Sequence, residues 1–336
     1  MNLLKECVIT ITKHPAECTL FFSKRKKFIP HFHQAIYGYR LLEKRGFISL
    51  KTVFSNDLNI PCDNVFYSQV NGKKIFYDLS DGIQNFEVAE FRDFLQQQNA
   101  VIFKRAYDEI LFGSEPLFFP YGLNHLALYP FYMRAICKLF PNPHFCKIPI
   151  AERCWTMKKD VSSVQNPILY STRLWDGWDE LNENRIMLAY KIRKFFTNAI
   201  VGIVDSPLAR KLCPDLILPH KITRRKNFID LINSSAVCVT STGLWNSAGW
   251  SLGEFVAAGK AILSEPLHFK VPGDFREGKN YLTFNSADDV LSKCEMLLKD
   301  PHKRMTMEME NRDYYSQYLQ PEVLVMNTLK QCSCYL

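Results

Sequence analysis

The chain has 336 residues, of which 47% are hydrophobic and 13% aromatic, so it can form two ordinary globular domains or one large one and does not resemble a disordered protein. The formal net charge of +8 fits either a mildly basic protein or one whose surface meets anions, such as nucleotide phosphates or lipid headgroups. Eleven scattered cysteines without a C-x-x-C pair argue against a disulfide framework and a zinc site, and no apolar run is long enough to span a bilayer. These features predict a cytoplasmic protein.

Strand and helix patterns alternate through the first half of the chain. A buried strand is predicted over Cys18–Lys24, and a helix follows in which Phe32, Ile36 and Tyr39 recur at helical spacing. Alternation of this kind implies parallel βαβ packing. The next expected elements are a strand and turn over 73–82, a helix over 87–98, and strands over 100–107 and 116–120.

The alternation lapses between Phe140 and Pro167, where proline, asparagine, serine and lysine are frequent, and a domain junction is predicted there. A second alternation follows, and the tail is predicted to form two helical segments broken before Pro321.

The fold class predicted is α/β, with two Rossmann-like domains built on parallel sheets. The expected domains are 1–150 on the acceptor side, 165–310 for nucleotide-sugar binding, and C-terminal helices over 311–336 that pack back on the first domain. The expected elements of the second half are strands near 167–173, 199–204, 236–243, 260–266 and 281–284, and helices near 182–196, 224–235, 250–258 and 287–299.

The segment "TSTGLWNSAGWSLGE" runs from the end of a strand into a helix. Small residues at Ser247, Ala248 and Gly249 would let backbone N–H groups approach a phosphate, and a helix N-terminus carries partial positive charge. We expect Glu254 in the first helical turn, where a carboxylate can accept hydrogen bonds from ribose hydroxyls. The alternative is an ordinary helix start, in which the acid complements the helix dipole.

An ordered set of features between residues 168 and 299 resembles the C-terminal domain of GT-B glycosyltransferases of the glycosyl transferases group 1 type, and within that group the spore-maturation glycosyltransferase-like branch. The resemblance implies GT-B architecture, a nucleotide-diphosphate sugar as donor, hexosyl transfer and a role in polysaccharide biosynthesis, such as lipopolysaccharide or capsule. It matches Glu254 to the second acid of the family's E-x7-E element, which binds the donor ribose. Asn246 stands where the first acid would be, which puts a donor-sugar contact there and the retaining stereochemistry in doubt. The resemblance is carried by "KITRRKNFIDLINSSAVCVTSTG", "SAGWSLGEFVAAGKAILSEP" and "FREGKNYLTFNSADDVLSKCEMLLKD".

Three further residues are candidates for donor binding. Arg173 leaves a strand and can pair with a diphosphate, or alternatively form a salt bridge with Asp176 or Asp179. Lys221 can reach a phosphate or be a solvated lysine, and Asn280 lies in the family's loop near the donor or in a turn. No metal or separate cofactor is expected, because basic groups and a helix terminus can stabilise the leaving diphosphate.

The first half supplies candidates for the catalytic base, which must take a proton from the attacking sugar hydroxyl. Asp81 is favoured over Asp78 because it lies past the end of its strand, although an aspartate there is also typical of a turn. His31 is the second choice, with His33 and His125 as further histidines near strand or helix ends. A cap or surface role is the alternative for each histidine.

The basic run Lys24–Lys27 sits beside apolar residues and suits peripheral contact with an anionic membrane, or it is a solvated loop. No motif typical of nucleic-acid binding accompanies it. The predicted function is therefore metal-independent transfer of a sugar from a nucleotide-sugar donor to a glycan or lipid-linked saccharide. Three alternatives stay open: a UDP-sugar 2-epimerase-like isomerase on the same fold, a non-catalytic glycosyltransferase-like binding protein, and an adaptor driven by charge.

Overall fold

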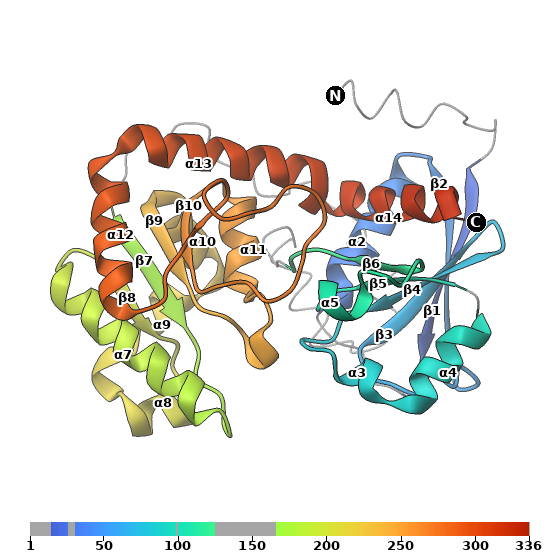
Figure 1. The fold of residues 1–336 in the computed structure, drawn as a ribbon, viewed down its shortest axis with the longest axis horizontal. Coiled ribbons are helices and arrows are strands. Elements are labelled where there is room, and N and C mark those ends of the chain that lie inside the picture. The colour runs from blue at the N-terminus through green and yellow to red at the C-terminus, as the bar shows by residue number, and fades with distance from the viewer. Residues whose placement is uncertain (1–14, 26–30, 99, 125–165, 336) are drawn as a thin grey trace. The chain divides into compact units, whose positions relative to one another are not determined.

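The computed structural model describes residues 15–25, 31–98, 100–124 and 166–335, which fall into two compact units (Figure 1). The first unit contains the described residues up to Tyr121 together with those from Gln320 onwards. The second contains the described residues of 122–124 and 166–319. Most of the expected junction lies outside the described residues, as does His125, so the expected domain bounds stay predictions.

The first unit is built on a six-stranded sheet in the order β2-β1-β3-β4-β5-β6. Its strands run parallel except β3, which is antiparallel to both of its neighbours. A two-residue turn, Asn71–Gly72, joins β3 to β4 with φ values of 49° and 87°, as an Asn-Gly hairpin requires. The expected parallel sheet is therefore interrupted by a hairpin. The elements of this unit are β1 (Ala16–Ser23), α2 (Phe32–Lys44), β2 (Ile48–Ser55), β3 (Val65–Val70), β4 (Lys73–Asp78), α3 (Gln84–Glu87), α4 (Ala89–Gln98), β5 (Val101–Lys104), α5 (Glu109–Phe112), β6 (Phe118–Pro120) and α14 (Pro321–Tyr335).

The C-terminal helix α14 packs against α2 within the first unit. The two helices come so close that a Cβ atom at Gly38 would lie 2.2 Å from the carbonyl oxygen of Pro321. The hydroxyl of Tyr77, on β4, lies 2.8 Å from Oγ1 of Thr328 on α14. Helix α14 is therefore part of this unit's core, because its backbone and a buried hydroxyl both contact elements from the start of the chain.

The second unit contains a five-stranded sheet, all parallel, in the order β11-β10-β9-β7-β8. Every residue of β9 is buried, which is typical of a parallel strand covered on both faces. Residues alternate between two cores along β7: Ile168 and Tyr170 face one, and Leu169 faces the other. The predicted α/β fold with parallel Rossmann-like strands is confirmed. The elements are β7 (Asn166–Thr172), α7 (Asp179–Phe195), β8 (Ile200–Ile203), α8 (Pro207–Leu212), η2 (Pro214–Leu216), α9 (His220–Thr223), α10 (Arg225–Ser234), β9 (Ser235–Thr240), η3 (Leu244–Asn246), α11 (Trp250–Ala257), β10 (Ala261–Ser264), β11 (Leu282–Thr283), α12 (Ala287–Lys299), α13 (Pro301–Tyr314) and η4 (Tyr315–Leu319).

Candidate functional site

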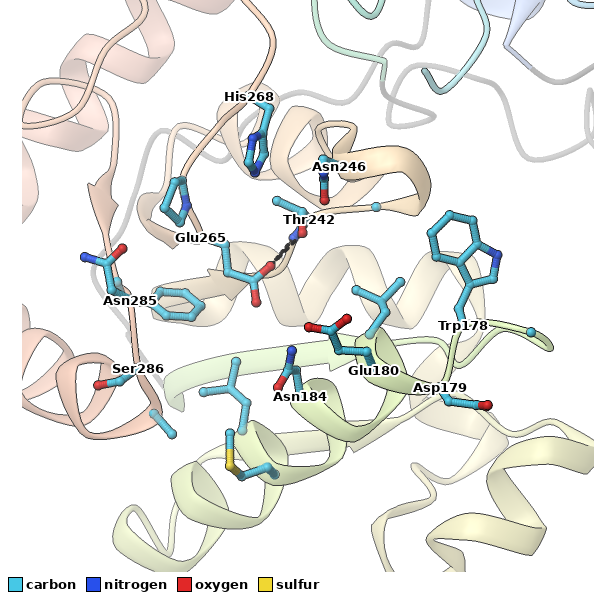
Figure 2. Close-up of a pocket in the computed structure, with 18 residues that line it drawn as sticks. Trp178, Asp179, Glu180, Asn184, Thr242, Asn246, Glu265, His268, Asn285 and Ser286 are labelled. Carbon is cyan, nitrogen blue, oxygen red and sulfur yellow. Dashed lines mark hydrogen bonds between the residues drawn. The ribbon is translucent and has the colours of Figure 1, made fainter. Parts of the chain in front are cut away.

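A cavity of about 600 Å³ lies within the second unit, at the carboxyl ends of its parallel strands (Figure 2). This edge is where open α/β sheets bind ligands, because the loops that leave the strands are free to carry polar side chains. The cavity is lined from α7 and from the segments that follow β9, β10 and β11. Its polar lining residues include Glu180, Asn184, Thr242, Asn246, Glu265 and His268.

A buried arginine on α7, Arg185, forms hydrogen bonds to the segments that follow β7 and β9, which we call strand exits. Arg185 is 5% exposed and donates from Nη1 to the carbonyl of Arg173, at 2.6 Å, where the chain has just left β7. It also donates from Nη2 to the carbonyl of Thr242, at 2.5 Å, and from Nε to Oγ of Ser241, at 3.1 Å, both after β9. Burial lowers the pKa of the Arg185 guanidinium, while nearby Tyr170 and Glu265 oppose that shift.

Thr242 extends this network to a third strand exit. Oε2 of Glu265, which follows β10, accepts from the backbone N–H of Thr242 at 2.7 Å and from its hydroxyl at 2.8 Å (Figure 2). Arg185 holds the carbonyl of the same residue. Three neighbouring strand exits are therefore joined by hydrogen bonds to charged groups, which are about twice as strong as neutral ones.

The loop after β9 holds two consecutive residues in the left-handed region. Trp245 and Asn246 both have a φ of 57°, which is uncommon for residues with a Cβ, although less so for asparagine. The loop closes through Gly243 N–H to the carbonyl of Ser247, at 2.7 Å. Trp245 is 54% exposed. Its ring packs edge to face on that of Trp178, a cavity residue, with 5.2 Å between the ring centroids. The left-handed turn therefore places Asn246 in the cavity wall, next in the chain to the exposed Trp245.

The small residues before α11, Ser247 to Gly249, take part in packing and hydrogen bonding within their own loop. Ser247 is buried, and its N–H donates to the carbonyl of Leu244 at 3.1 Å, so its phosphate-binding role stays a prediction. Gly249 precedes the first residue of α11, and a Cβ there would lie 3.0 Å from the carbonyl oxygen of Ser241. Ala248 is partly exposed between them. Close packing of the loop on itself therefore explains the absence of a side chain at Gly249.

Glu254 lies one turn further into its helix than predicted. Helix α11 begins at Trp250, so the expectation of a first-turn acid is wrong, and the residue is 5% exposed. Side chains of a helix lean toward its N-terminus, so a second-turn carboxylate is still directed back over the first turn. The ribose-binding role of Glu254 stays a prediction.

The amide of Asn280 is bound within the protein, and its predicted donor contact stays a prediction. This residue is fully buried, and its amide nitrogen donates to Oδ1 of Asn311 at 3.1 Å, while its own Oδ1 accepts from the backbone N–H of Arg276 at 3.1 Å. Asn311 in turn donates to the carbonyls of Lys260 and Asn280. Asn280 therefore joins the segment before β11 to α13 through its buried amide.

Arg173 and Lys221 are both exposed, and neither lines the cavity. Within the described residues the Arg173 guanidinium forms no ion pair, so the alternative of a salt bridge with Asp176 or Asp179 is not found. Lys221 lies on the short helix α9. Their phosphate-binding roles stay predictions.

The first unit brings the two predicted catalytic residues together at the carboxyl end of β4. Nδ1 of His31 lies 2.9 Å from the carbonyl oxygen of Leu79 and must donate to it, which places the lone pair of the neutral ring on Nε2. Asp81 forms an ion pair with Arg105. Burial, followed by the charge of Arg105, lowers the pKa of His31 to about 4, so the imidazole is neutral at physiological pH.

Asp78, the less favoured base, is part of a sealed network. Its Oδ2 accepts from Nζ of Lys104 at 2.6 Å, and both side chains are at most 2% exposed. Its Oδ1 accepts from the hydroxyl of Ser80 at 2.6 Å and from the amide of Asn85 at 3.0 Å. Asp78 is thus a structural acid, and its partner Lys104 was missed because it lies on a different strand.

The predicted membrane-binding run is only partly described. Lys24 and Arg25 are exposed, and Arg25 donates to Oδ1 of Asn59 at 3.1 Å, whereas Lys26 and Lys27 lie outside the described residues. None of the helices in the described part of the chain combines the length and apolar composition needed to cross a bilayer. No group of three His, Cys, Asp or Glu side chains in that same part is placed to hold a metal ion.

The sequence analysis missed Glu180 and Glu265, which line the cavity, and Arg185, which joins the strand exits beside it. One signal was available: Arg185 lies three residues before Leu188 and four before Ala189, both of them buried, and so occupies the apolar face of its helix. A charge on that face requires a partner, which marks it as a candidate for a buried polar network.

No protein-family model and no curated protein sequence matches the chain. Among solved structures, it is similar to WaaG, a glycosyltransferase involved in lipopolysaccharide biosynthesis, with 9% identity over 92% of this chain and 98% of that one, at a TM-score of 0.46. It is similar to HepE of Anabaena in complex with UDP and glucose, with 11% identity, coverage of 95% and 100%, and a TM-score of 0.40. It is also similar to a Listeria monocytogenes protein described as a UDP-N-acetylglucosamine 2-epimerase, with 10% identity, coverage of 94% and 95%, and a TM-score of 0.44. Because these TM-scores are all below 0.5, the fold assignment rests on the strand order of this chain.

Proposed function

We propose that the chain is a glycosyltransferase of GT-B architecture that moves a hexosyl group from a nucleotide-diphosphate sugar to a glycan or lipid-linked saccharide. The observation that carries this proposal is the carboxyl edge of the second unit's parallel sheet, where a cavity, a strained loop and a helix start meet within one short stretch. The ordered sequence motifs between residues 168 and 299 support the same family, including its spore-maturation branch.

The donor is assigned to the second unit. Arg173 is exposed where the chain leaves β7 and can pair with the diphosphate, whose charge is also favoured at the start of α11 beside Ala248 and Gly249. Glu254 is assigned to the ribose hydroxyls, because its position on α11 directs the carboxylate toward that helix start. Lys221 remains a candidate for a further phosphate contact. This arrangement stabilises the leaving diphosphate with fixed positive groups and needs no metal.

The proton-accepting role is assigned to His31 of the first unit rather than to Asp81. The acceptor hydroxyl forms a new bond to the anomeric carbon, the bond from that carbon to the phosphate oxygen breaks, and the hydroxyl proton passes to Nε2. The hydrogen bond from Nδ1 to Leu79 fixes the tautomer that leaves Nε2 as the acceptor. Asp81 is paired with Arg105, which makes it a weaker base candidate.

The partner of the reaction is proposed to be a growing polysaccharide, such as lipopolysaccharide or capsule, held at the cytoplasmic face of a membrane. The exposed charges of Lys24 and Arg25 support this assignment, because basic side chains are attracted to anionic lipid surfaces.

The deciding experiment combines binding and turnover. Thermal unfolding with UDP, GDP, ADP and CMP should identify the nucleotide by an increase in melting temperature. Glu254→Gln and Arg173→Ala should each raise the dissociation constant of that nucleotide about ten-fold, while Lys194→Ala on the exposed face of α7 should not. Chromatography of the sugar products then separates transfer from epimerisation. Unchanged nucleotide affinity in both variants would refute the donor assignments, and formation of an epimer would replace the transferase by an isomerase.

A further inference from the structure

The cavity at the carboxyl edge of the second sheet has a charge that does not suit the phosphates of a nucleotide. Among the described residues that line it there are three carboxylates, from Asp179, Glu180 and Glu265, and no lysine or arginine. The buried Arg185 on α7 donates to the backbone carbonyls of Arg173 and Thr242 and to the hydroxyl of Ser241. A diphosphate placed here would meet like charges at short range, so the lining favours an uncharged polar occupant over an anionic one.

The remaining polar groups are those that recognise hydroxyls. Glu180 and Asn184 lie four residues apart on α7 and therefore share one face of that helix (Figure 2). A carboxylate accepts hydrogen bonds at about four lone-pair sites, and a carboxamide both accepts and donates. Such a pair can hold two neighbouring hydroxyls of one ring, since each hydroxyl is itself both a donor and an acceptor.

Glu265 is held in place by contacts that leave part of its carboxylate for a ligand. Its Oε2 accepts two hydrogen bonds from Thr242, and Arg185 holds the carbonyl of the same threonine. This anchoring fixes the side chain before a ligand arrives, which lowers the entropic cost of binding. Asn246 joins the same wall through its left-handed backbone.

Trp178 supplies the apolar surface that such a ligand needs. Its ring is partly exposed, lines the cavity, and is steadied by the edge-to-face contact with Trp245. One aromatic face with a few convergent hydrogen-bonding groups is the arrangement expected of a site for a small polar ring. A volume of about 600 Å³ falls within the usual range of ligand cavities and leaves room for more than one ring.

We propose that this cavity binds an uncharged saccharide ring through Glu180, Asn184, Glu265 and Trp178, and excludes phosphate. The ring could be the sugar of the nucleotide-sugar donor or a residue of a free glycan, because both present the same hydroxyls. In the first case the proposal rests on the proposed function, with the diphosphate held outside the cavity near Arg173. In the second case the proposal does not depend on the proposed function.

The test compares three kinds of probe on the full-length chain by calorimetry. They are the nucleotides UDP and GDP, the nucleotide sugars UDP-glucose, UDP-N-acetylglucosamine and GDP-mannose, and the free sugars glucose, N-acetylglucosamine and mannose. Glu180→Gln and Glu265→Gln keep the size of each side chain and remove its charge. The matched control is Glu183→Gln, on the same helix but exposed and outside the cavity.

We expect Glu180→Gln and Glu265→Gln to raise the dissociation constant of the sugar-bearing probes about ten-fold and to leave that of UDP and GDP within two-fold. A loss seen only with nucleotide sugars identifies the donor sugar as the occupant, whereas a loss seen with free sugars identifies a glycan. If either variant instead binds UDP or GDP more tightly, phosphate enters the cavity and the proposal is wrong. Equal affinities for every probe in wild type and variants, or no binding of any sugar-bearing probe, would also overturn it.

The failure of the proposed function is distinguishable from these outcomes. A wild-type chain that binds no nucleotide and no nucleotide sugar, but binds a free sugar that Glu180→Gln weakens, would refute the nucleotide-sugar transferase and retain the saccharide cavity.

Discussion

The carboxyl edges of the two sheets handle buried positive charge in opposite ways. In the first unit Lys104 is paired with Asp78 and Arg105 with Asp81, so each cation has a carboxylate partner. In the second unit Arg185 donates to carbonyl and hydroxyl oxygens, and the carboxylates of the cavity line its walls instead. At the first edge the paired charges neutralise one another beside the imidazole of His31, whose lowered pKa keeps it neutral. At the second edge the carboxylates form no ion pair within the described residues and line the cavity as hydrogen-bond acceptors.

The largest effect is expected where the pairing is most deeply buried. Replacing Lys104 by methionine would leave the Asp78 carboxylate charged and almost fully buried, so we expect a loss of about 3–5 kcal/mol in the free energy of unfolding, measured by urea denaturation. Adding Asp78→Asn to that variant should recover part of the loss, because the uncompensated charge is then removed. A single variant that loses less than 1 kcal/mol would show that the pair is solvated.

A conservative change in the hydrogen-bond network of Arg185 should lower the free energy of unfolding by a smaller amount. Arg185→Lys keeps the charge but cannot reach three acceptors in fixed geometry, so we expect a loss of about 2 kcal/mol in unfolding free energy. If the network also positions Glu265 and the loop at Thr242, the affinity for sugar-bearing probes should fall more than that for UDP or GDP. Lys194→Ala, on the exposed face of the same helix, should change both quantities little. Equal stability of wild type and Arg185→Lys would contradict the view that this arginine joins the strand exits.

Acidification should distinguish the two edges further. Burial is the largest cause that lowers the pKa of both His31 and His33 to about 4. The charge of Arg105 further lowers the pKa of His31, and the charge of His31 further lowers that of His33. Between about pH 6.5 and pH 4 the unfolded chain therefore binds more protons than the folded one, and stability should fall as the pH drops through that window. The melting temperature should decrease by several degrees across it.

His31→Asn is the matching variant, because an asparagine amide can still donate to Leu79 but does not titrate. The slope of melting temperature against pH should become shallower in this variant. Transfer activity at pH 7 should fall by about 10²-fold or more if Nε2 takes the acceptor's proton. An unchanged slope together with unchanged activity would make His31 a helix-start residue and nothing more.

The smallest effect is expected at the surface. Lys24→Glu combined with Arg25→Glu should weaken binding to vesicles that contain anionic lipid by about 1 kcal/mol for each charge, with little change in stability. Vesicle sedimentation at low and physiological salt measures this, and the difference should shrink as salt is added. Neutral vesicles provide the control. Binding to anionic vesicles that survives the double charge reversal would assign the run to a solvated loop.

The sequence contained more of the fold than its alternation pattern alone suggested. The dipeptide Asn71–Gly72 between two runs of strand-forming residues is the strongest short-range signal for a hairpin, and it accounts for the antiparallel β3. Strand–helix alternation by itself predicts that all strands are parallel. This is right for the sheet of the second unit, but in the first unit β3 is antiparallel to its neighbours.

The partners of several site residues could not be predicted from the sequence, because they are distant along the chain. Arg185 contacts residues 56 and 57 positions away, and Asp78 meets Lys104 across 26 positions. Asn280 looked like a loop residue near a ligand, yet Asn311 on a later helix occupies its amide. Such pairings depend on which strand lies beside which, and that order is not encoded in any local pattern.

What the sequence determined by itself was the alternation of strands and helices, the parallel sheet of the second half, the helix break before Pro321 and the presence of a small-residue turn before α11. These features depend on periodicity and on the backbone limits of proline and glycine, which act within a few residues. What only the tertiary structure decided was which polar groups are paired and which line a cavity. Burial makes an unpaired charge costly, so the fate of each charged side chain was settled only when distant strands brought it a partner or left it facing the cavity.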